Sequence, residues 1–233
     1  MIGIIAGTGF YDLGFLGVAG EKTIKTAHGE AYAIYGKDFL FIPRHGRDRN
    51  TPSHMLNHKA NISAFKQEGV TEIIALTSVG SMKKSMPPKS IIIPHDYMHL
   101  SGIPTFNDSR AVHITPDLDE ELRKKIIAAA QKLKIRVTPR GVYLQTTGPR
   151  LETRAEISMF KNYADVVGMT MASEATLAKE LGLKYAAISL VDNYAHGILD
   201  TPLDFTQVIK ASAEQRGGLK MIIKELIEQG AEK

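Results

Sequence analysis

Short apolar runs rich in β-branched residues alternate with longer amphipathic stretches along the chain, and this alternation constrains the fold more than any other feature. Runs of this kind bounded by glycine or proline are typical of buried strands. We predict strands at residues 2–6, 40–42, 72–76, 90–93 and 185–190. We predict helices at residues 54–67, 118–133, 153–162, 173–181 and 206–229. The alternation predicts an α/β fold with a mainly parallel, mixed sheet flanked by helices.

Three residues mark where predicted helices begin or end. Asp117 would cap the second helix and Asp204 the last, because a short acidic side chain accepts hydrogen bonds from the free N–H groups of a first turn. Gly69 would end the first helix, since glycine readily adopts the left-handed conformation found there.

Composition limits the class of protein. The 233 residues are 43% hydrophobic, enough for one substantial core, and we predict a single domain over residues 1–233. The formal charge is +4, but basic and acidic residues alternate along the sequence. They therefore do not form the basic cluster that is typical of nucleic-acid binding. The chain has no cysteine, no signal-peptide pattern at its start and no apolar run near the ~20 residues that span a bilayer. We therefore expect a cytoplasmic protein without a membrane or nucleic-acid partner.

Polar residues that follow three predicted strands indicate an anion site. The first group is a glycine turn with one hydroxyl, the second an arginine and histidine pair, and the third a hydroxyl-rich turn. Ligands of such sheets bind at the carboxyl ends of the strands, so the three groups would meet there. A site built from all three would suit phosphate. The residues are Thr8 within Gly7-Thr8-Gly9, Arg44, His45, Thr77 and Ser78.

Each group alone has other interpretations. The glycine turn could simply join a strand to a helix, and it lacks the third glycine of a dinucleotide-binding fingerprint. The loop at residues 43–49 could be a solvated basic loop. It also resembles the Arg-His-Gly signature of histidine phosphatases, in which His45 would accept a phosphoryl group. That signature normally follows the first strand, where this chain has the glycine turn.

Three further residues are candidates for a ligand site. Glu152 follows a Gly-Pro turn and could project into a cleft, or it could be an ordinary acid in the first turn of a helix. Met169 could line the site or fill the core. Asn193 follows an apolar run and could be a plain turn residue.

Seven motifs together resemble the trimeric purine nucleoside phosphorylase and methylthioadenosine phosphorylase family. They occur in the family's order across nearly the whole chain. They are GIIAGTGF from residue 3, PRHGR from 43, HKANISAFKQEGV from 58, TSVGS from 77, GPRLETRAE from 148, VVGMTMASEATLAKELGL from 166 and ISLVDN from 188.

The resemblance implies roles for these residues. Phosphate would be held by Thr8, Arg44, His45, Thr77, Ser78 and Thr170, and the ribose would pack on Met169. The implied reaction is phosphorolysis of a nucleoside, with inorganic phosphate as co-substrate and with no metal or organic cofactor. The implied assembly is a homotrimer or a dimer of trimers. In it His113 would reach the site of a neighbouring subunit.

Glu152 and Asn193 bear on which purine is recognised. The resemblance places Leu151, Glu152 and Asn193 around the base. An ionised Glu152 can accept the N1–H of a 6-oxopurine while the Asn193 amide donates to N7 or O6. Adenine-specific relatives carry Ser and Asp at these two positions. Asp192 stands where relatives usually have Thr, and a slip of one residue would place that acid at the base instead.

The start of the last predicted helix bears on the 5′ group. Relatives that act on ordinary ribonucleosides place a histidine where this chain has Phe205, and Val208 and Ile209 lie one turn on. An apolar wall favours a methylthio group over a hydroxyl, which would lose its water without a partner. The preferred substrate would be 5′-methylthioinosine. Inosine or guanosine, and then methylthioadenosine, are the alternatives.

Two other classes of protein remain as alternatives to the phosphorylase. A histidine phosphatase would release phosphate from a phosphomonoester, whereas a phosphorylase consumes phosphate. A non-catalytic nucleotide-binding module would keep Glu152 and Asn193 and show no turnover.

Overall fold

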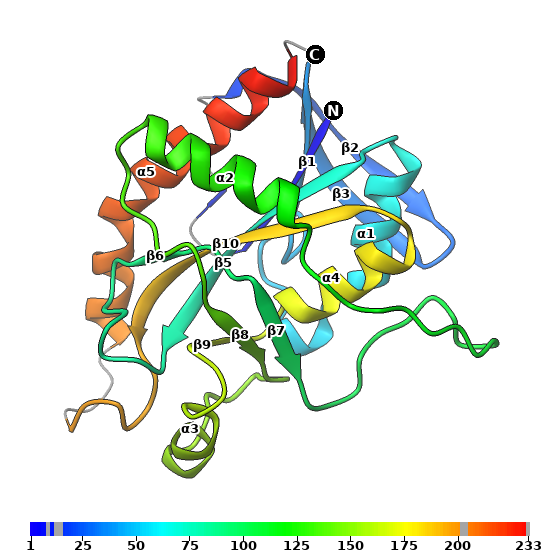
Figure 1. The fold of residues 1–233 in the computed structure, drawn as a ribbon. Coiled ribbons are helices and arrows are strands. Elements are labelled where there is room, and N and C mark those ends of the chain that lie inside the picture. Colours follow the sequence, from blue (N-terminus) through cyan, green and yellow to red (C-terminus); the bar gives the residue numbers. More distant parts are fainter. Residues whose placement is uncertain (8–9, 12–15, 201–204, 232–233) are drawn as a thin grey trace.

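The computed structural model describes residues 1–7, 10–11, 16–200 and 205–231, with the backbone alone at 205–215 and 231. Over these residues the chain forms one mixed sheet with helices on both faces (Figure 1). The described strands are β1 Ile2–Ala6, β2 Val18–Thr26, β3 Gly29–Gly36, β4 Phe39–Pro43, β5 Glu72–Ser81, β6 Ile91–Ile92, β7 Asp96–His99, β8 Val142–Gln145, β9 Val166–Gly168 and β10 Lys184–Tyr194. The described α-helices are α1 His58–Gln67, α2 Glu120–Lys132, α3 Arg154–Phe160, α4 Met171–Glu180 and α5 Phe205–Ala231. The predicted fold class is confirmed.

The centre of the sheet is parallel. The strand order is β2-β3-β4-β1-β5-β9-β8-β7, and β10 pairs with β5 and β6. β1 pairs in parallel with β4 and β5, and β5 pairs in parallel with β10. The antiparallel β2–β3 hairpin and the β5–β9 pair make the sheet mixed. The carboxyl ends of β1, β4, β5 and β10 therefore meet at one edge.

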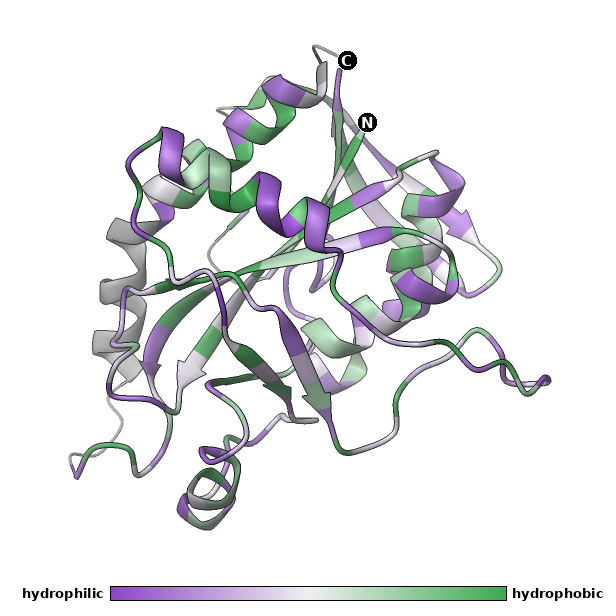
Figure 2. Ribbon diagram, in the orientation of Figure 1, coloured by the Kyte–Doolittle hydropathy of each residue, from purple (hydrophilic) through white to green (hydrophobic). Residues whose placement is uncertain are grey.

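Two helix pairs cover the two faces of the sheet. Successive side chains of a strand point to opposite faces, so Ile73 of β5 packs with α1 and α4, whereas Ile74 packs with α2 and α5. Figure 2 shows the green apolar stripes of α2 and the second half of α5 turned toward the sheet. None of the described helices is long and apolar enough to cross a bilayer.

Several predicted boundaries differ from the structure. α1 begins at His58 rather than at residue 54, because a separate 3₁₀ turn occupies Ser53–Met55. Asp119, not the predicted Asp117, caps α2, and its carboxylate accepts the N–H of Leu122 at 2.8 Å.

The side chain of Asp117 instead pairs with Lys179 at 2.8 Å. The prediction for Gly69 is confirmed, since it follows α1 at φ +75° and donates to the carbonyl of Lys66. Asp204 lies outside the described residues.

Candidate active site

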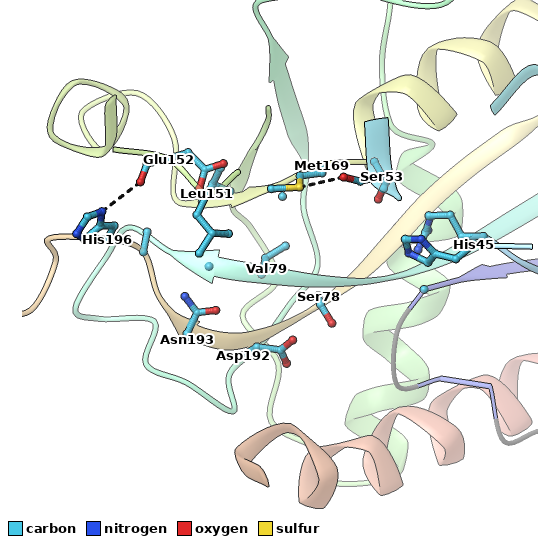
Figure 3. Close-up of a pocket in the computed structure, with 17 residues that line it drawn as sticks. His45, Ser53, Ser78, Val79, Leu151, Glu152, Met169, Asp192, Asn193 and His196 are labelled. Carbon is cyan, nitrogen blue, oxygen red and sulfur yellow. Dashed lines mark hydrogen bonds between the residues drawn. The ribbon is translucent and has the colours of Figure 1, made fainter. Parts of the chain in front are cut away.

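A cavity of about 230 Å³ lies at the edge where the central parallel strands end. The turns after β1 and β4, the ends of β5 and β10, the β9–α4 junction and the loop before α3 all contribute to its wall. Figure 3 shows His45 at one end, Glu152, Asn193 and His196 at the other, and Met169 and Ser78 between them. Residues separated by up to 189 positions are thus brought into one elongated site. The lining residues are Gly7, Arg44, His45, Ser53, Ser78, Val79, Gly80, Leu151, Glu152, Val167, Gly168, Met169, Thr170, Asp192, Asn193, Ala195 and His196.

Arg44 is held by a buried ion pair. Its side chain is 2% exposed and that of Glu174 is 0% exposed. Nε and Nη2 of Arg44 donate to the two carboxylate oxygens of Glu174, and Nη1 donates to the carbonyl of Leu76 at 3.0 Å. Burial opposes the charge of Arg44, but Glu174 outweighs it and raises the arginine pKa. The guanidinium is therefore a fixed cation at the cavity wall.

His45 presents one ring nitrogen to the same end of the cavity. Its Nδ1 lies 2.7 Å from the carbonyl of Thr51, which can only accept, so Nδ1 carries the proton. Burial lowers the pKa of His45, the Thr51 carbonyl opposes that change, and the nearby Arg44 adds to it. In the neutral ring, Nε2 is then a lone pair that can accept a proton from a ligand.

Gly7 allows the side chains of Arg44 and His45 to approach the backbone after β1. A Cβ atom at residue 7 would lie 3.0 Å from Nη1 of Arg44 and 3.2 Å from Nε2 of His45. Both distances are tighter than ordinary van der Waals contact, so a side chain at this position would displace the pair. The predicted meeting of the first two strand ends is confirmed, although Thr8 itself lies outside the described residues.

The start of α4 faces the same end of the cavity. Thr170 is its N-cap residue, is buried and makes no side-chain capping bond. Its hydroxyl pairs with that of Tyr143 and, as both donor and acceptor, can also bond to a ligand. Tyr143 accepts the N–H groups of Thr170 and Met171 at 3.3 and 3.5 Å, which anchors the first turn. A helix N-terminus favours an anion.

The predicted turn at Thr77 and Ser78 is wrong, because β5 continues through it to Ser81. Alternation along the strand sends the two side chains to opposite faces. Ser78 lines the cavity, whereas Thr77 is buried and its hydroxyl bonds to Ser189 at 2.8 Å. Thr77 is therefore not brought into the cavity.

Met169 and Ser53 form the wall midway along the site. The Ser53 hydroxyl donates to the sulfur of Met169 at 3.2 Å. A Cβ at Gly148, which has φ +70°, would lie 2.6 Å from that sulfur and 2.7 Å from Oγ of Ser53. Only glycine leaves room for this contact.

Glu152 is buried at the end opposite Arg44. Its side chain accepts a hydrogen bond from the Thr146 hydroxyl at 2.5 Å through Oε1. No described residue bonds to the second oxygen, Oε2, which leaves one acceptor for a ligand. Leu151 beside it is 41% exposed and also lines the cavity.

Asp192 and Asn193 both line the cavity because β10 is irregular at this point. The parallel register with β5 shifts between Val191 and Asn193. The Asn193 amide donates one hydrogen to the carbonyl of Tyr194 at 2.8 Å and has a second. Burial raises the pKa of Asp192, and a hydrogen bond with Ser78 opposes that change. In Figure 3 Asp192 lies beneath Ser78 and Asn193 lies nearer to the end that holds Glu152.

The remaining predicted residues lie outside this arrangement. His113 is exposed on the long segment between β7 and α2 and does not line the cavity. The side chains of Phe205, Val208 and Ile209 lie outside the described residues. Conversely, sequence reasoning missed Glu174, Ser53 and His196. An acid in the first turn of a predicted helix and an isolated histidine carry no signal of their spatial partners.

Acidic and histidine side chains do not gather into a metal site in the described part of the chain. No group of three or more is arranged to hold an ion there. The polar groups of the cavity instead divide into a cationic end and an amide–carboxylate end.

Comparisons with known proteins agree with this geometry. The family model of the phosphorylase superfamily matches residues 1–228. The chain is 43% identical to a probable 6-oxopurine nucleoside phosphorylase of Archaeoglobus fulgidus, over 98% of this chain and 96% of that one. It is 39% identical to a probable S-methyl-5′-thioinosine phosphorylase of Methanothermobacter thermautotrophicus, over 97% and 83% of the two chains.

A solved structure shows the same fold. The methylthioadenosine phosphorylase of Schistosoma mansoni in complex with adenine superposes with a TM-score of 0.90 at 24% identity, covering 100% of this chain and 92% of that one. The chain therefore belongs to the phosphorylase superfamily of enzymes.

Proposed function

We propose that this enzyme is a pentosyltransferase that uses inorganic phosphate to cleave the N-glycosidic bond of a 6-oxopurine nucleoside. The observation that carries the proposal is the single cavity with Arg44 and His45 at one end and Glu152 and Asn193 at the other (Figure 3). Two of its relatives are named probable 6-oxopurine nucleoside phosphorylase and probable S-methyl-5′-thioinosine phosphorylase.

The cationic end suits phosphate. Arg44 keeps its charge, the Thr170 hydroxyl can donate, and the N-terminus of α4 favours an anion. A hydrogen phosphate ion can donate its own proton to Nε2 of neutral His45 while the other groups donate to its oxygens. Phosphate would thus be fixed beneath C1′ of the nucleoside, where its negative charge stabilises a ribosyl cation.

The opposite end suits the leaving purine. An oxygen of phosphate forms a bond to C1′ as the C1′–N9 bond breaks, and the electron pair of that bond goes to the purine. The Asn193 amide can donate to N7 or O6 as charge develops there, and the free oxygen of Glu152 can accept N1–H. Adenine has no hydrogen on N1, so it would leave that carboxylate unpaired.

We further propose 5′-methylthioinosine as the preferred substrate, with hypoxanthine and 5-methylthioribose 1-phosphate as products. Inosine and guanosine are the next candidates and methylthioadenosine follows. The enzyme would act in the cytoplasm, in purine salvage, as a homotrimer or a dimer of trimers, with His113 reaching a neighbour's site. Phosphate would be a co-substrate, and no metal or organic cofactor would take part.

A panel of nucleosides tests the substrate. Methylthioinosine, inosine, guanosine, methylthioadenosine and adenosine are each assayed with phosphate, and kcat/KM is compared. We expect kcat/KM to be higher for methylthioinosine than for methylthioadenosine, and higher for inosine than for adenosine. Faster cleavage of methylthioadenosine than of methylthioinosine would overturn the base assignment and point to Asp192.

The 5′ group gives a prediction about Phe205. Burying a methylthio group against an apolar wall should favour methylthioinosine over inosine by roughly 10–200-fold in kcat/KM. Phe205→His should narrow that ratio, because the imidazole can pair with a 5′-hydroxyl. The KM for phosphate serves as the control and should not change. Equal kcat/KM for the two substrates in the unmodified enzyme would contradict the apolar wall.

The lowered pKa of His45 predicts how anion binding depends on pH. Burial lowers this pKa, so the ring is neutral at high pH and Nε2 cannot donate. Sulfate carries no proton to offer in this range and needs a donor. Its dissociation constant should therefore fall as the pH is lowered below about 6.5, the ordinary pKa of histidine, by up to about tenfold per pH unit, as His45 gains a proton.

Calorimetric titration with sulfate at several pH values checks this expectation. His45→Asn, which does not titrate, should bind sulfate with little dependence on pH. A pH dependence that is the same in the variant and in the unmodified protein would exclude His45 as its source.

A further inference from the structure

His196 connects the two segments that carry Glu152 and Asn193. Its Nδ1 lies 3.3 Å from the backbone carbonyl of Glu152, as the dashed line in Figure 3 shows. Its Nε2 lies 3.2 Å from Nε of Arg154, the first residue of α3. The end of β10 is thereby tied to the loop before α3.

A single protonation state of His196 satisfies both contacts. The Arg154 guanidinium only donates hydrogen bonds, so Nε2 of His196 must accept. The carbonyl of Glu152 only accepts, so Nδ1 must carry the hydrogen and donate. The neutral ring with its proton on Nδ1 meets both requirements.

The backbone on both sides is shaped for this contact. Gly197 has φ +84°, and a Cβ there would lie 3.1 Å from Cγ of Arg154, so glycine lets the arginine stem cross the chain. Arg154 begins α3 directly after Thr153, whose hydroxyl accepts the N–H of Glu156 at 3.2 Å. The Glu156 carboxylate accepts the Thr153 N–H at 2.7 Å in return. This capping box fixes the position from which Arg154 reaches His196.

We propose that His196, held by Arg154, is a positioning residue that sets the place of Glu152 relative to Asn193 and so helps to select 6-oxopurines. The inference rests on the proposed function, because it concerns how that base site is built. Leu151 next to Glu152 is 41% exposed, so its side chain contributes little packing to hold the loop. A small displacement of a positioned group can cost about a hundredfold in rate.

Replacing His196 by phenylalanine removes both hydrogen bonds and keeps an aromatic ring, whereas glutamine keeps one donor and one acceptor. His196→Phe should lower kcat/KM for inosine by about 10–100-fold while the KM for phosphate stays within about twofold. His196→Gln should recover most of this loss. Arg154→Ala should resemble His196→Phe. Arg136→Ala, at an exposed arginine that does not line the cavity, is the matched control and should leave kcat/KM unchanged.

The affinities for free bases measure base selection directly. A residue that only stabilised the fold would not change the ratio of these affinities. The ratio of dissociation constants for purine and hypoxanthine, measured by calorimetry, should fall toward one in His196→Phe and Arg154→Ala and remain high in His196→Gln. An unchanged ratio, or equal losses in His196→Phe and His196→Gln, would overturn the proposal. A protein that cleaves no nucleoside yet shows the expected ratios would refute the proposed function and leave the positioning role in place.

Discussion

Replacing Glu174 by leucine should lower the free energy of unfolding by about 3–5 kcal/mol, because it leaves the buried guanidinium of Arg44 without its counter-ion. Glu174 is fully buried and accepts hydrogen bonds from Arg44 and from the hydroxyl of Tyr185. Denaturant unfolding followed by circular dichroism measures the change.

A double variant separates the ion pair from its surroundings. Arg44→Met combined with Glu174→Leu removes both charges and should be more stable than Glu174→Leu alone. Glu121→Leu, at an exposed acid of α2, is the matched control and should change stability by no more than about 0.5 kcal/mol. If Glu174→Leu lowered the free energy of unfolding by as little as the control does, the Arg44–Glu174 pair would not stabilise the fold.

Glu152→Gln should lower kcat/KM for inosine by roughly 10–150-fold, or about 1.5–3 kcal/mol, with little change in stability. Glutamine keeps the length of the side chain and can still accept the hydrogen bond of Thr146. It loses the charged acceptor that would meet N1–H of the base. Steady-state kinetics with inosine, with the KM for phosphate as an internal control, measures the effect.

The same variant should narrow the preference for inosine over adenosine. Glutamine can turn its amide to donate to N1 of adenine, which the carboxylate cannot do. A parallel loss for both nucleosides would mean that Glu152 does not read the base.

The buried strands of the sheet are readily predicted from sequence because their side chains are apolar on both faces. β1 has the predicted bounds, residues 2–6. β5 and β10 extend past their predicted ends into polar residues, because each continues to pair with the other. The β2–β3 hairpin was not predicted: in β2 only Ile24 is buried, so the strand carries no apolar run.

The site was predictable where its residues follow strand ends. Arg44 and His45 lie at the cavity because they follow β4, which ends at the same edge as its parallel neighbours. Glu152 reaches the cavity from the loop between β8 and α3. The position of Thr77 was not predictable, because the face on which a side chain lies depends on where its strand ends. The Arg44–Glu174 pair joins residues 130 positions apart, and only the packing of α4 against the sheet brings them together.

Phosphorolysis is tested most directly by following phosphate in a reaction with inosine or methylthioinosine. The purified protein is incubated with the nucleoside, with and without inorganic phosphate, and the products are followed by phosphorus NMR and chromatography. Hypoxanthine should appear only with phosphate, in equal amount with a pentose 1-phosphate. Hypoxanthine released without phosphate, or a phosphorylated His45 formed from a phosphomonoester, would contradict phosphorolysis.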